Sequence, residues 1–429
     1  MPRLLVFMLA VCLSATGCRP SEQPTQPEQA GAPGTGHNAS SAGDQEAELG
    51  GLVIGEPLRH ANLTIFPVSS KVPRNEDLYI TLDEGLKAGT VEVFEVGAIN
   101  ARTTGEDREQ PGMEEAVADE PALPPAQQAS DDPFTQEVGG DVNRLMVVNR
   151  SGRLLYLMPG EIIYGGKQDR CIGCEYLIVS GEEPVPIEVY CVEQGRWAGR
   201  MLDQSAGELQ ALAYQAGRPL EEEEARRLAA EANRGKFVAS AGNLSKASRL
   251  AVQTGDGQGQ VWQEVATANA AAEIQGDTGA FTANYADQDV AKELQTYADK
   301  LERPIAETRQ VVGVVMAVNG KVEAMDVFGS TPLFKKLWPK LLRSYALDAA
   351  NVADDEEADK RSTRKDARGF LASALEGEEQ SKTEVDGGLV VSRRSSGRVV
   401  GFGAGFAAED ASGGMGGGFG GVHYSAFSE

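Results

Sequence analysis

The chain has 429 residues, with 40 Lys and Arg against 64 Asp and Glu, so its formal net charge of −24 argues against binding nucleic acid through backbone phosphates. Three His and 6% aromatic residues leave few side chains for acid–base chemistry, metal binding or base stacking. The 50 Gly and 20 Pro gather in a few stretches, which indicates one main domain with long excursions outside its core.

Residues 1–18 are typical of a bacterial export signal, with a short basic start, the apolar run Leu4–Leu13 and small residues before Cys18. About ten apolar residues are too few to span a bilayer. The end of this segment resembles a lipobox, with Ala15 where Leu is usual, and predicts lipid attachment to Cys18. Arg19 in place of Asp favours the periplasmic face of the outer membrane. Ordinary signal cleavage, which would release a soluble periplasmic protein, is the alternative.

Residues 19–50 hold almost no large apolar side chain, and their Pro, Gln, Ser, Gly and Glu predict a disordered tether. A single α+β domain is expected over residues 51–429. It contains two excursions, an acid-rich insertion at residues 100–140 that is predicted to be disordered and a Gly-rich loop at residues 403–421. The tether would join this domain to the membrane through the N-terminal lipid.

Apolar alternation bounded by turn residues predicts strands, and apolar spacings of three and four predict helices. The expected strands are Asn62–Val68, Val91–Val96, Arg144–Asn149, Leu154–Met158, Tyr176–Val179, Ile187–Val192, Leu389–Ser392, Val399–Phe402 and Val422–Phe427. The expected helices are Leu82–Lys87, those within Asp203–Asn233, Asp287–Leu301, one from Pro332, and Ala367–Leu375. The four strands between residues 144 and 192 are expected to form one sheet.

The clearest local signal lies in Gln310–Phe328, where two apolar runs flank Asn319–Gly320. This dipeptide suits a type I′ turn and predicts a hairpin. In the helix that follows, Pro339 is expected to cause a kink or a delayed start. Together these elements predict an α+β fold with a mixed, mainly antiparallel sheet and flanking helices.

The densest polar segment follows a predicted strand, and its adjacent glycines and two cations are suited to holding an anion. It runs from Glu161 to Arg170, and its candidate site residues are Gly165, Gly166, Lys167, Gln168 and Arg170, with Asp169 between the last two. It is not a Walker A loop, because Gln168 stands where Ser or Thr would hold magnesium. A β-turn carrying surface charges is the alternative interpretation.

A second polar segment ends the strand Ile187–Val192, and it contains Glu193, Arg196 and Trp197. Arg and Trp are the side chains that most often anchor ligands or partner proteins. The alternative is an internal ion pair between Glu193 and Arg196, with Trp197 covering the sheet.

Cys171 and Cys174 have CxxC spacing, but Cys191 is the only further Cys nearby and no His accompanies them, so a zinc site is not expected. Structural thiols are favoured over redox catalysis, and a disulfide within the pair or from one of them to Cys191 stays open. The chain has no Gly-x-Ser-x-Gly motif, and its glycine run is not followed by a helix. We expect no metal and no cofactor, and we interpret His423 as a satisfied, partly buried strand residue.

Several blocks, in this order, resemble the ADP-ribosylglycohydrolase and rhodanese-phosphatase-associated domain family. They are Asn62–Pro67, Leu82–Glu84, Gly165–Arg170, Cys191–Trp197, Val312–Val315 with Asn319–Gly320, and Val422–Tyr424 before Phe427. The resemblance extends over scattered blocks from Leu52 to Phe427. It implies no established activity, but the family's name implies an association with enzymes of ADP-ribose and NAD metabolism. The chain departs from the family in its lipoprotein signal, its acidic insertion and its CxxC pair.

The resemblance also implies that the two polar segments form one site. There, Lys167, Arg170 and Arg196 would contact phosphate or carboxylate, and Trp197 would stack on a planar group. Glu193 would orient Arg196 or act as an acid–base group.

The leading hypothesis is a lipid-anchored envelope protein whose domain binds an anionic ligand, such as a nucleotide or an ADP-ribose-like compound, or an envelope partner protein. A hydrolase of phosphorylated or ADP-ribosyl-type substrates, with Glu193 as the acid–base residue, is one alternative. A structural envelope lipoprotein without a small ligand is another. The sequence leaves open whether the protein is an enzyme.

Overall fold

The computed structural model describes residues 48–96, 143–195, 202–215, 219–274, 276, 278–352, 361–385, 389–406 and 421–429. The predicted export signal, the acidic insertion and most of the predicted tether lie outside these residues, as do Arg196 and Trp197. The predicted end of the tether at residue 50 is wrong, because Glu48 and Leu49 pair with Leu52 and Val53 in a sheet. Contacts within the chain group residues 42–429 into one unit. The first polar segment and Glu193 fall inside the described residues.

The largest sheet has ten strands, all paired antiparallel, and includes strands from both ends of the described chain. Its order is β1-β2-β4-β14-β15-β19-β18-β17-β16, and β3 also pairs with β4. The strands are β1 (Glu48–Leu49), β2 (Leu52–Ile54), β3 (Leu58–His60), β4 (Leu63–Ser70), β14 (Val311–Val318), β15 (Lys321–Phe328), β16 (Glu378–Val385), β17 (Leu389–Ser396), β18 (Val399–Phe406) and β19 (His423–Ser428). β18 therefore includes the first residues of the expected Gly-rich loop.

Two smaller sheets are built from the middle of the chain. The first is a closed barrel of β6 (Val91–Glu95), β7 (Arg144–Asn149), β9 (Glu161–Gly165), β10 (Arg170–Ile172), β12 (Val185–Cys191) and β13 (Lys236–Asn243). The second contains β5 (Tyr79–Thr81), β8 (Leu154–Leu157) and β11 (Tyr176–Ile178), in which β5 and β8 run parallel.

The expectation of one sheet for residues 144–192 is therefore wrong. β7 and β12 pair within the barrel, whereas β8 and β11 pair with each other beside β5. Strand signals are local, but the choice of pairing partner depends on residues far away in the sequence.

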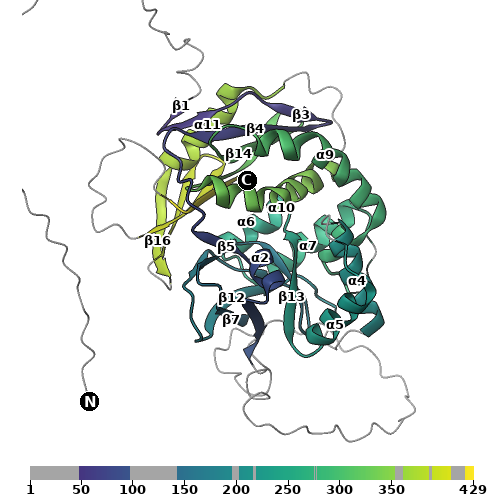
Figure 1. Ribbon diagram of the computed structural model, residues 1–429. Coiled ribbons are helices and arrows are strands. Elements are labelled where there is room, and N and C mark those ends of the chain that lie inside the picture. Colours follow the sequence, from purple (N-terminus) through teal and green to yellow (C-terminus); the bar gives the residue numbers. More distant parts are fainter. Residues whose placement is uncertain are drawn as a thin grey trace, which may run out of the picture. The chain divides into compact units, whose positions relative to one another are not determined.

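Helices cover both faces of the large sheet (Figure 1). On one face, α10 packs against α9 and β14, and on the other, α11 contacts β17 and β18. Alternate residues of β4 accordingly enter two apolar clusters, Leu63 and Ile65 on the α10 side and Phe66 and Val68 on the α11 side. The helices are α2 (Leu82–Ala88), α4 (Leu202–Gln215), α5 (Glu222–Ala232), α6 (Lys246–Thr254), α7 (Gln258–Ala271), α8 (Thr282–Ala286), α9 (Gln288–Ala306), α10 (Thr331–Ala350) and α11 (Arg364–Glu376). Within the described ranges, no helix has the length and apolar character that crossing a membrane requires.

The predicted α+β class with mainly antiparallel strands is confirmed. The predicted hairpin is also confirmed, because Val318 pairs directly with Lys321 across the two turn residues. α10 begins with Pro332 in its first turn, as expected, and the helix contains Pro339, so its start is not delayed.

Candidate functional site

The two polar segments meet at the end of the barrel where β10 and β12 pair. Arg170 lies opposite Cys191 in the register of these strands. Beyond that pair, Gln168 Nε2 donates to the carbonyl oxygen of Glu193 at 2.9 Å, and the backbone N–H of Asp169 donates to Glu193 Oε2 at 3.1 Å. The structure thus brings the first segment to the beginning of the second, while Arg196 and Trp197 lie outside the described residues.

Both glycines of the first segment are required by close packing against β13. Gly165 has φ 140° and Gly166 has φ 58°, values that side chains rarely adopt. A Cβ atom at Gly165 would lie 2.3 Å from the Lys236 carbonyl oxygen, and one at Gly166 would lie 2.9 Å from both Glu95 Oε1 and Phe237 Cζ. These glycines therefore let the chain turn between protein neighbours.

The backbone donors of this turn already have protein acceptors. The N–H of Gly166 donates to the Lys236 carbonyl oxygen at 3.0 Å, and that of Lys167 donates to Glu95 Oε1 at 2.9 Å. The N–H of Gly165 lies 3.4 Å from Asp169 Oδ1. Since these groups are occupied, contact with an anion would fall to the side chains of the turn.

Arg170 is a buried side chain of this turn with unused hydrogen-bonding capacity. It is 3% exposed, its Nη1 donates to Gln168 Oε1 at 3.0 Å, and its Nε has no partner. Gln168 Oε1 also accepts from Cys191 Sγ at 3.4 Å, so a neutral amide is the main neighbour of a buried cation. No carboxylate among the described residues forms an ion pair with Arg170. The neighbouring Lys167 is exposed. A buried, unpaired charge is costly, and a bound anion would offset that cost.

Residues 51–412 match the ARG and Rhodanese-Phosphatase-superfamily-associated Protein domain, ARPP-1. The chain belongs to this family. The match confirms the family resemblance predicted from the sequence blocks. No curated protein and no solved structure has significant similarity to the chain.

Two buried carboxylates hold the turn of the ARPP-1 domain in place. Glu193 is 1% exposed and accepts from the Asp169 backbone, and Asp169 Oδ2 accepts from Thr282 Oγ1 at 2.8 Å. Glu193 therefore has a clear role in fixing the shape of the turn.

The three described cysteines of the ARPP-1 domain are free thiols. Cys171 lies opposite Tyr190 and Cys191 lies opposite Arg170, so the two cysteines point to opposite faces of the β10–β12 pair. Burial raises the pKa of the Cys171 thiol to about 12 and also raises the pKa of Cys191. Because the thiolate is the reactive form, these two residues are inert structural thiols at neutral pH.

A second polar cluster lies in the core of the ARPP-1 domain. Asp326 on β15 accepts from both Nη atoms of Arg249 on α6, at 2.9 and 2.6 Å, and from the hydroxyl of Tyr345. His423 on β19 bridges Asp326, at 2.9 Å from Nε2, and Glu175, at 2.5 Å from Nδ1. Burial opposes the charged form of His423, but the two carboxylates outweigh this effect and raise its pKa to about 9. The interpretation of His423 as a satisfied histidine is confirmed, and its burial is complete.

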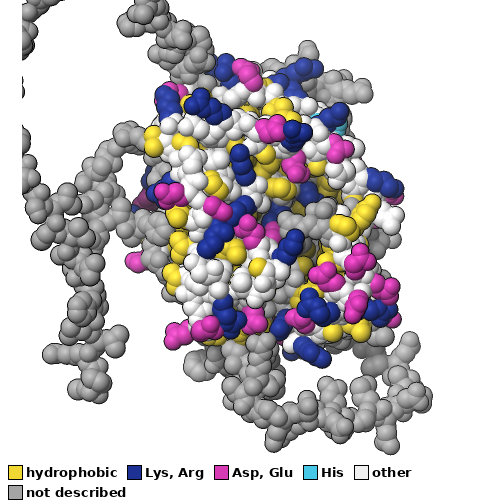
Figure 2. Space-filling model, in the orientation of Figure 1, with side chains coloured by type: hydrophobic (Ala, Val, Ile, Leu, Met, Phe, Trp, Pro, Cys, Tyr) yellow, Lys and Arg dark blue, Asp and Glu magenta, His cyan; other side chains and the backbone are white. Residues whose placement is uncertain are grey.

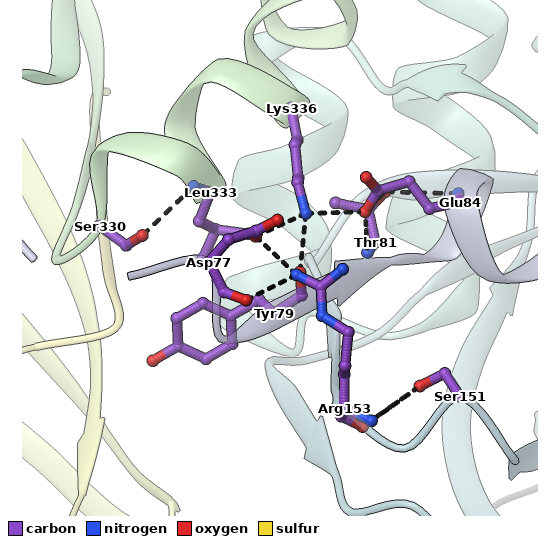
Figure 3. Close-up of polar contacts among 9 residues, drawn as sticks. All are labelled: Asp77, Tyr79, Thr81, Glu84, Ser151, Arg153, Ser330, Leu333 and Lys336. Atoms are coloured by element: carbon purple, nitrogen blue, oxygen red, sulfur yellow. Dashed lines mark hydrogen bonds and ion pairs between the residues drawn. The ribbon is translucent and has the colours of Figure 1, made fainter. Parts of the chain in front are cut away.

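A third polar cluster connects α10 to the smaller sheets (Figure 3). Lys336 Nζ lies 2.7 Å from Asp77 Oδ1 and 3.1 Å from Glu84 Oε2, and it donates to the Tyr79 carbonyl oxygen at 2.8 Å. Arg153, the residue before β8, pairs with the same Asp77 oxygen at 2.6 Å. Sequence reasoning missed this cluster because its members come from separate segments without a shared motif.

Surface charge alone does not locate a site. On the face shown in Figure 2, Lys and Arg side chains are interspersed with Asp and Glu. The buried and unpaired Arg170 is therefore a more specific signal than the charges on this face.

Proposed function

We propose that this protein is an exported, lipid-anchored envelope protein whose ARPP-1 domain binds a small anionic ligand through Arg170 and Lys167. The observation that carries the ligand proposal is the burial of Arg170 beside a neutral amide, with Nε unpaired. Arg recognises carboxylate and phosphate groups through two parallel hydrogen bonds, and such charge-assisted bonds are strong in a dry environment.

The geometry favours a ligand with a compact anionic end. Arg170 is nearly inaccessible, so the group that reaches it must be small, such as a phosphate or a carboxylate. Lys167 is exposed on the same turn and is suited to a more solvated part of the ligand. The family description records an association with ARG and rhodanese-phosphatase proteins, which makes nucleotides and ADP-ribose the first compounds to test.

A thermal-shift experiment tests this proposal on the chain without residues 1–18. Inorganic phosphate, nucleotides, ADP-ribose and sugar phosphates are added separately, and the unfolding temperature is measured. A ligand at 100 times its dissociation constant stabilises the fold by about 2.7 kcal/mol, which is readily measured. We expect at least one of these anions to raise the unfolding temperature, and Arg170→Gln and Lys167→Ala to reduce or abolish that shift.

The matched control is Arg226→Ala, which removes a solvent-exposed guanidinium on α5 that pairs with Asp203 and Glu222. This variant should retain the full shift. A shift that persists in Arg170→Gln would overturn the assignment of the site. The absence of any shift in the unmodified domain would overturn small-anion binding and favour a partner protein or a structural envelope role.

A further inference from the structure

Ser240 lies on β13 between two interruptions of its pairing with β9. The register shifts between Phe237 and Ala239, and again between Ser240 and Gly242. Gly242, at the second shift, has φ 123°, a backbone conformation that favours glycine. Bulges redirect side chains and are common beside active sites. The side chain of Ser240 retains partial exposure at this position.

The Ser240 hydroxyl is hydrogen-bonded to a cluster of charged side chains. Its Oγ donates to Glu161 Oε1 at 2.8 Å and accepts from Lys340 Nζ at 3.0 Å. Lys340 also pairs directly with Glu161, and Asp83 Oδ2 holds the same ammonium at 2.6 Å. A nucleophile bonded to a base that is oriented by a third group is the arrangement that activates serine hydroxyls.

The charged side chains around Ser240 favour loss of its hydroxyl proton. Burial raises the pKa of Glu161, so its carboxylate is a stronger base than that of an exposed Glu. Burial opposes the charged form of Lys340, but Asp83 and Glu161 outweigh this effect and keep its pKa raised. Lys340 therefore stays an ammonium, and its positive charge beside Oγ stabilises a developing alkoxide.

Two buried polar atoms on β9 and β13, the strands that carry Glu161 and Ser240, have no hydrogen-bond partner. They are Glu161 Oε2 and Asn243 Nδ2, and both residues are fully buried. Asn243 lies directly opposite Glu161 in the β13–β9 pairing. One acceptor and one donor are therefore unused on a single cross-strand pair, although buried polar groups are nearly always satisfied. A substrate carbonyl oxygen would accept from Asn243 Nδ2, and a substrate hydroxyl would donate to Glu161 Oε2.

We propose that Ser240 is the nucleophile of an acyl-transfer site that hydrolyses small carboxylic esters, with Glu161 as its general base. Oγ bonds to the ester carbonyl carbon while its proton moves to Glu161 Oε1. The bond to the alkoxide oxygen breaks, and that oxygen takes the proton from Glu161 as the alcohol leaves. Water then attacks the acyl carbon and gives a proton to Glu161. Ser240 regains this proton as the carboxylic acid departs.

Lys340 is a catalytic residue because it contacts the reacting Ser240 oxygen, whereas Asp83 acts as a positioning residue. Lys340 fixes the Glu161 carboxylate, and Asp83 fixes Lys340. This activity is separate from anion binding at Arg170, so Ser240→Ala should keep any thermal shift produced by an anion.

The test is covalent labelling of the purified chain by a fluorophosphonate and by a smaller sulfonyl fluoride. In either reaction, Oγ displaces fluoride and the proton passes to Glu161, so intact mass and peptide mapping identify the modified residue. We expect one adduct, located on Ser240, and hydrolysis of p-nitrophenyl acetate that is lost in Ser240→Ala. Glu161→Gln should slow labelling at least about 100-fold.

The control is Ser381→Ala, which removes an exposed hydroxyl on β16 and should leave labelling and hydrolysis unchanged. Since Glu161→Gln alters a buried ion pair, its circular dichroism spectrum must match that of the unmodified chain. The absence of an adduct with both probes, or an adduct on another residue, would overturn the proposal irrespective of that variant.

Discussion

Arg170 and Arg249 are both buried arginines, and their surroundings give them different roles. Arg249 makes two hydrogen bonds to the Asp326 carboxylate, so its charge is balanced within the protein. Arg170 contacts the neutral amide of Gln168 and has an unpaired Nε. A residue whose charge is balanced contributes to the fold, whereas one without an anion has capacity left for a ligand.

His423 makes the stability of the domain depend on pH. Its pKa is about 9 in the folded state against 6.5 for an ordinary histidine, because Glu175 and Asp326 overcome the effect of burial. A raised pKa contributes stability that is fully present below pH 6.5 and is lost as the pH rises through about 9. We expect the unfolding free energy to fall by about 3 kcal/mol over that range, as measured by urea titrations at pH 6, 7.5 and 9.

His423→Gln should remove most of this pH dependence, because the substituted side chain has no proton to lose in that range. His60→Gln is the matched control, since His60 bonds to the Thr296 hydroxyl and has no carboxylate partner among the described residues. If His423→Gln loses stability with pH as steeply as the unmodified chain, the dependence arises elsewhere.

Part of the site could be predicted at the level of residues. The segments containing Lys167 and Glu193 were identified because each is dense in polar side chains, and the structure shows that they meet. The Ser240 site could not be found this way. Asp83, Ser240 and Lys340 each have an ordinary local sequence, and only the tertiary fold brings them together.

At the scale of elements, the β14–β15 hairpin follows directly from its turn sequence. Asn319 and Gly320 both have positive φ, 47° and 74°, as a type I′ turn requires. Gly320→Ala forces a side chain into the left-handed region and should lower the unfolding free energy by about 1 kcal/mol. Gly369→Ala provides a control of opposite sign, because Gly369 lies within α11 with no atom within 4 Å of an added Cβ. That change should stabilise the domain by about 0.5 kcal/mol.

Urea titrations measure the free energy of unfolding of Gly320→Ala, Gly369→Ala and the unmodified chain. Equal effects of the two substitutions would show that the turn conformation does not determine the outcome.

Elements without a local signal were missed. β16 (Glu378–Val385) is an edge strand with exposed polar side chains, so it lacks the apolar alternation that indicates a strand.

Pro67 lies inside β4, a central strand, although proline is unfavourable there because it lacks a backbone N–H. Its carbonyl oxygen accepts from Gly55 N–H at 2.8 Å, so the side of Pro67 that lacks an N–H faces the gap between β2 and β3. The missing donor therefore costs no ladder hydrogen bond.

At the scale of the whole domain, charged side chains join parts that are distant in the sequence. Lys336 and Lys340 on α10 reach Glu84 and Asp83 on α2, and His423 on the large sheet reaches Glu175 beside β11. Local patterns predict many of the strands and helices, but they carry no information about these long-range contacts.

The proposal that the whole molecule is a lipoprotein rests on Cys18, and it is tested by its chemistry. Two or more acyl chains bury enough CH₂ groups, at about 0.8 kcal/mol each, to hold a protein stably at a membrane. In a bacterial host, the unmodified chain should incorporate labelled palmitate and enter the detergent phase of Triton X-114, whereas Cys18→Ser should do neither. Cys12→Ser, which changes the other cysteine of the predicted export signal, should leave both results unchanged. Palmitate incorporation in Cys18→Ser, or its absence from the unmodified chain, would contradict lipid attachment at this position while leaving ligand binding at Arg170 to be judged separately.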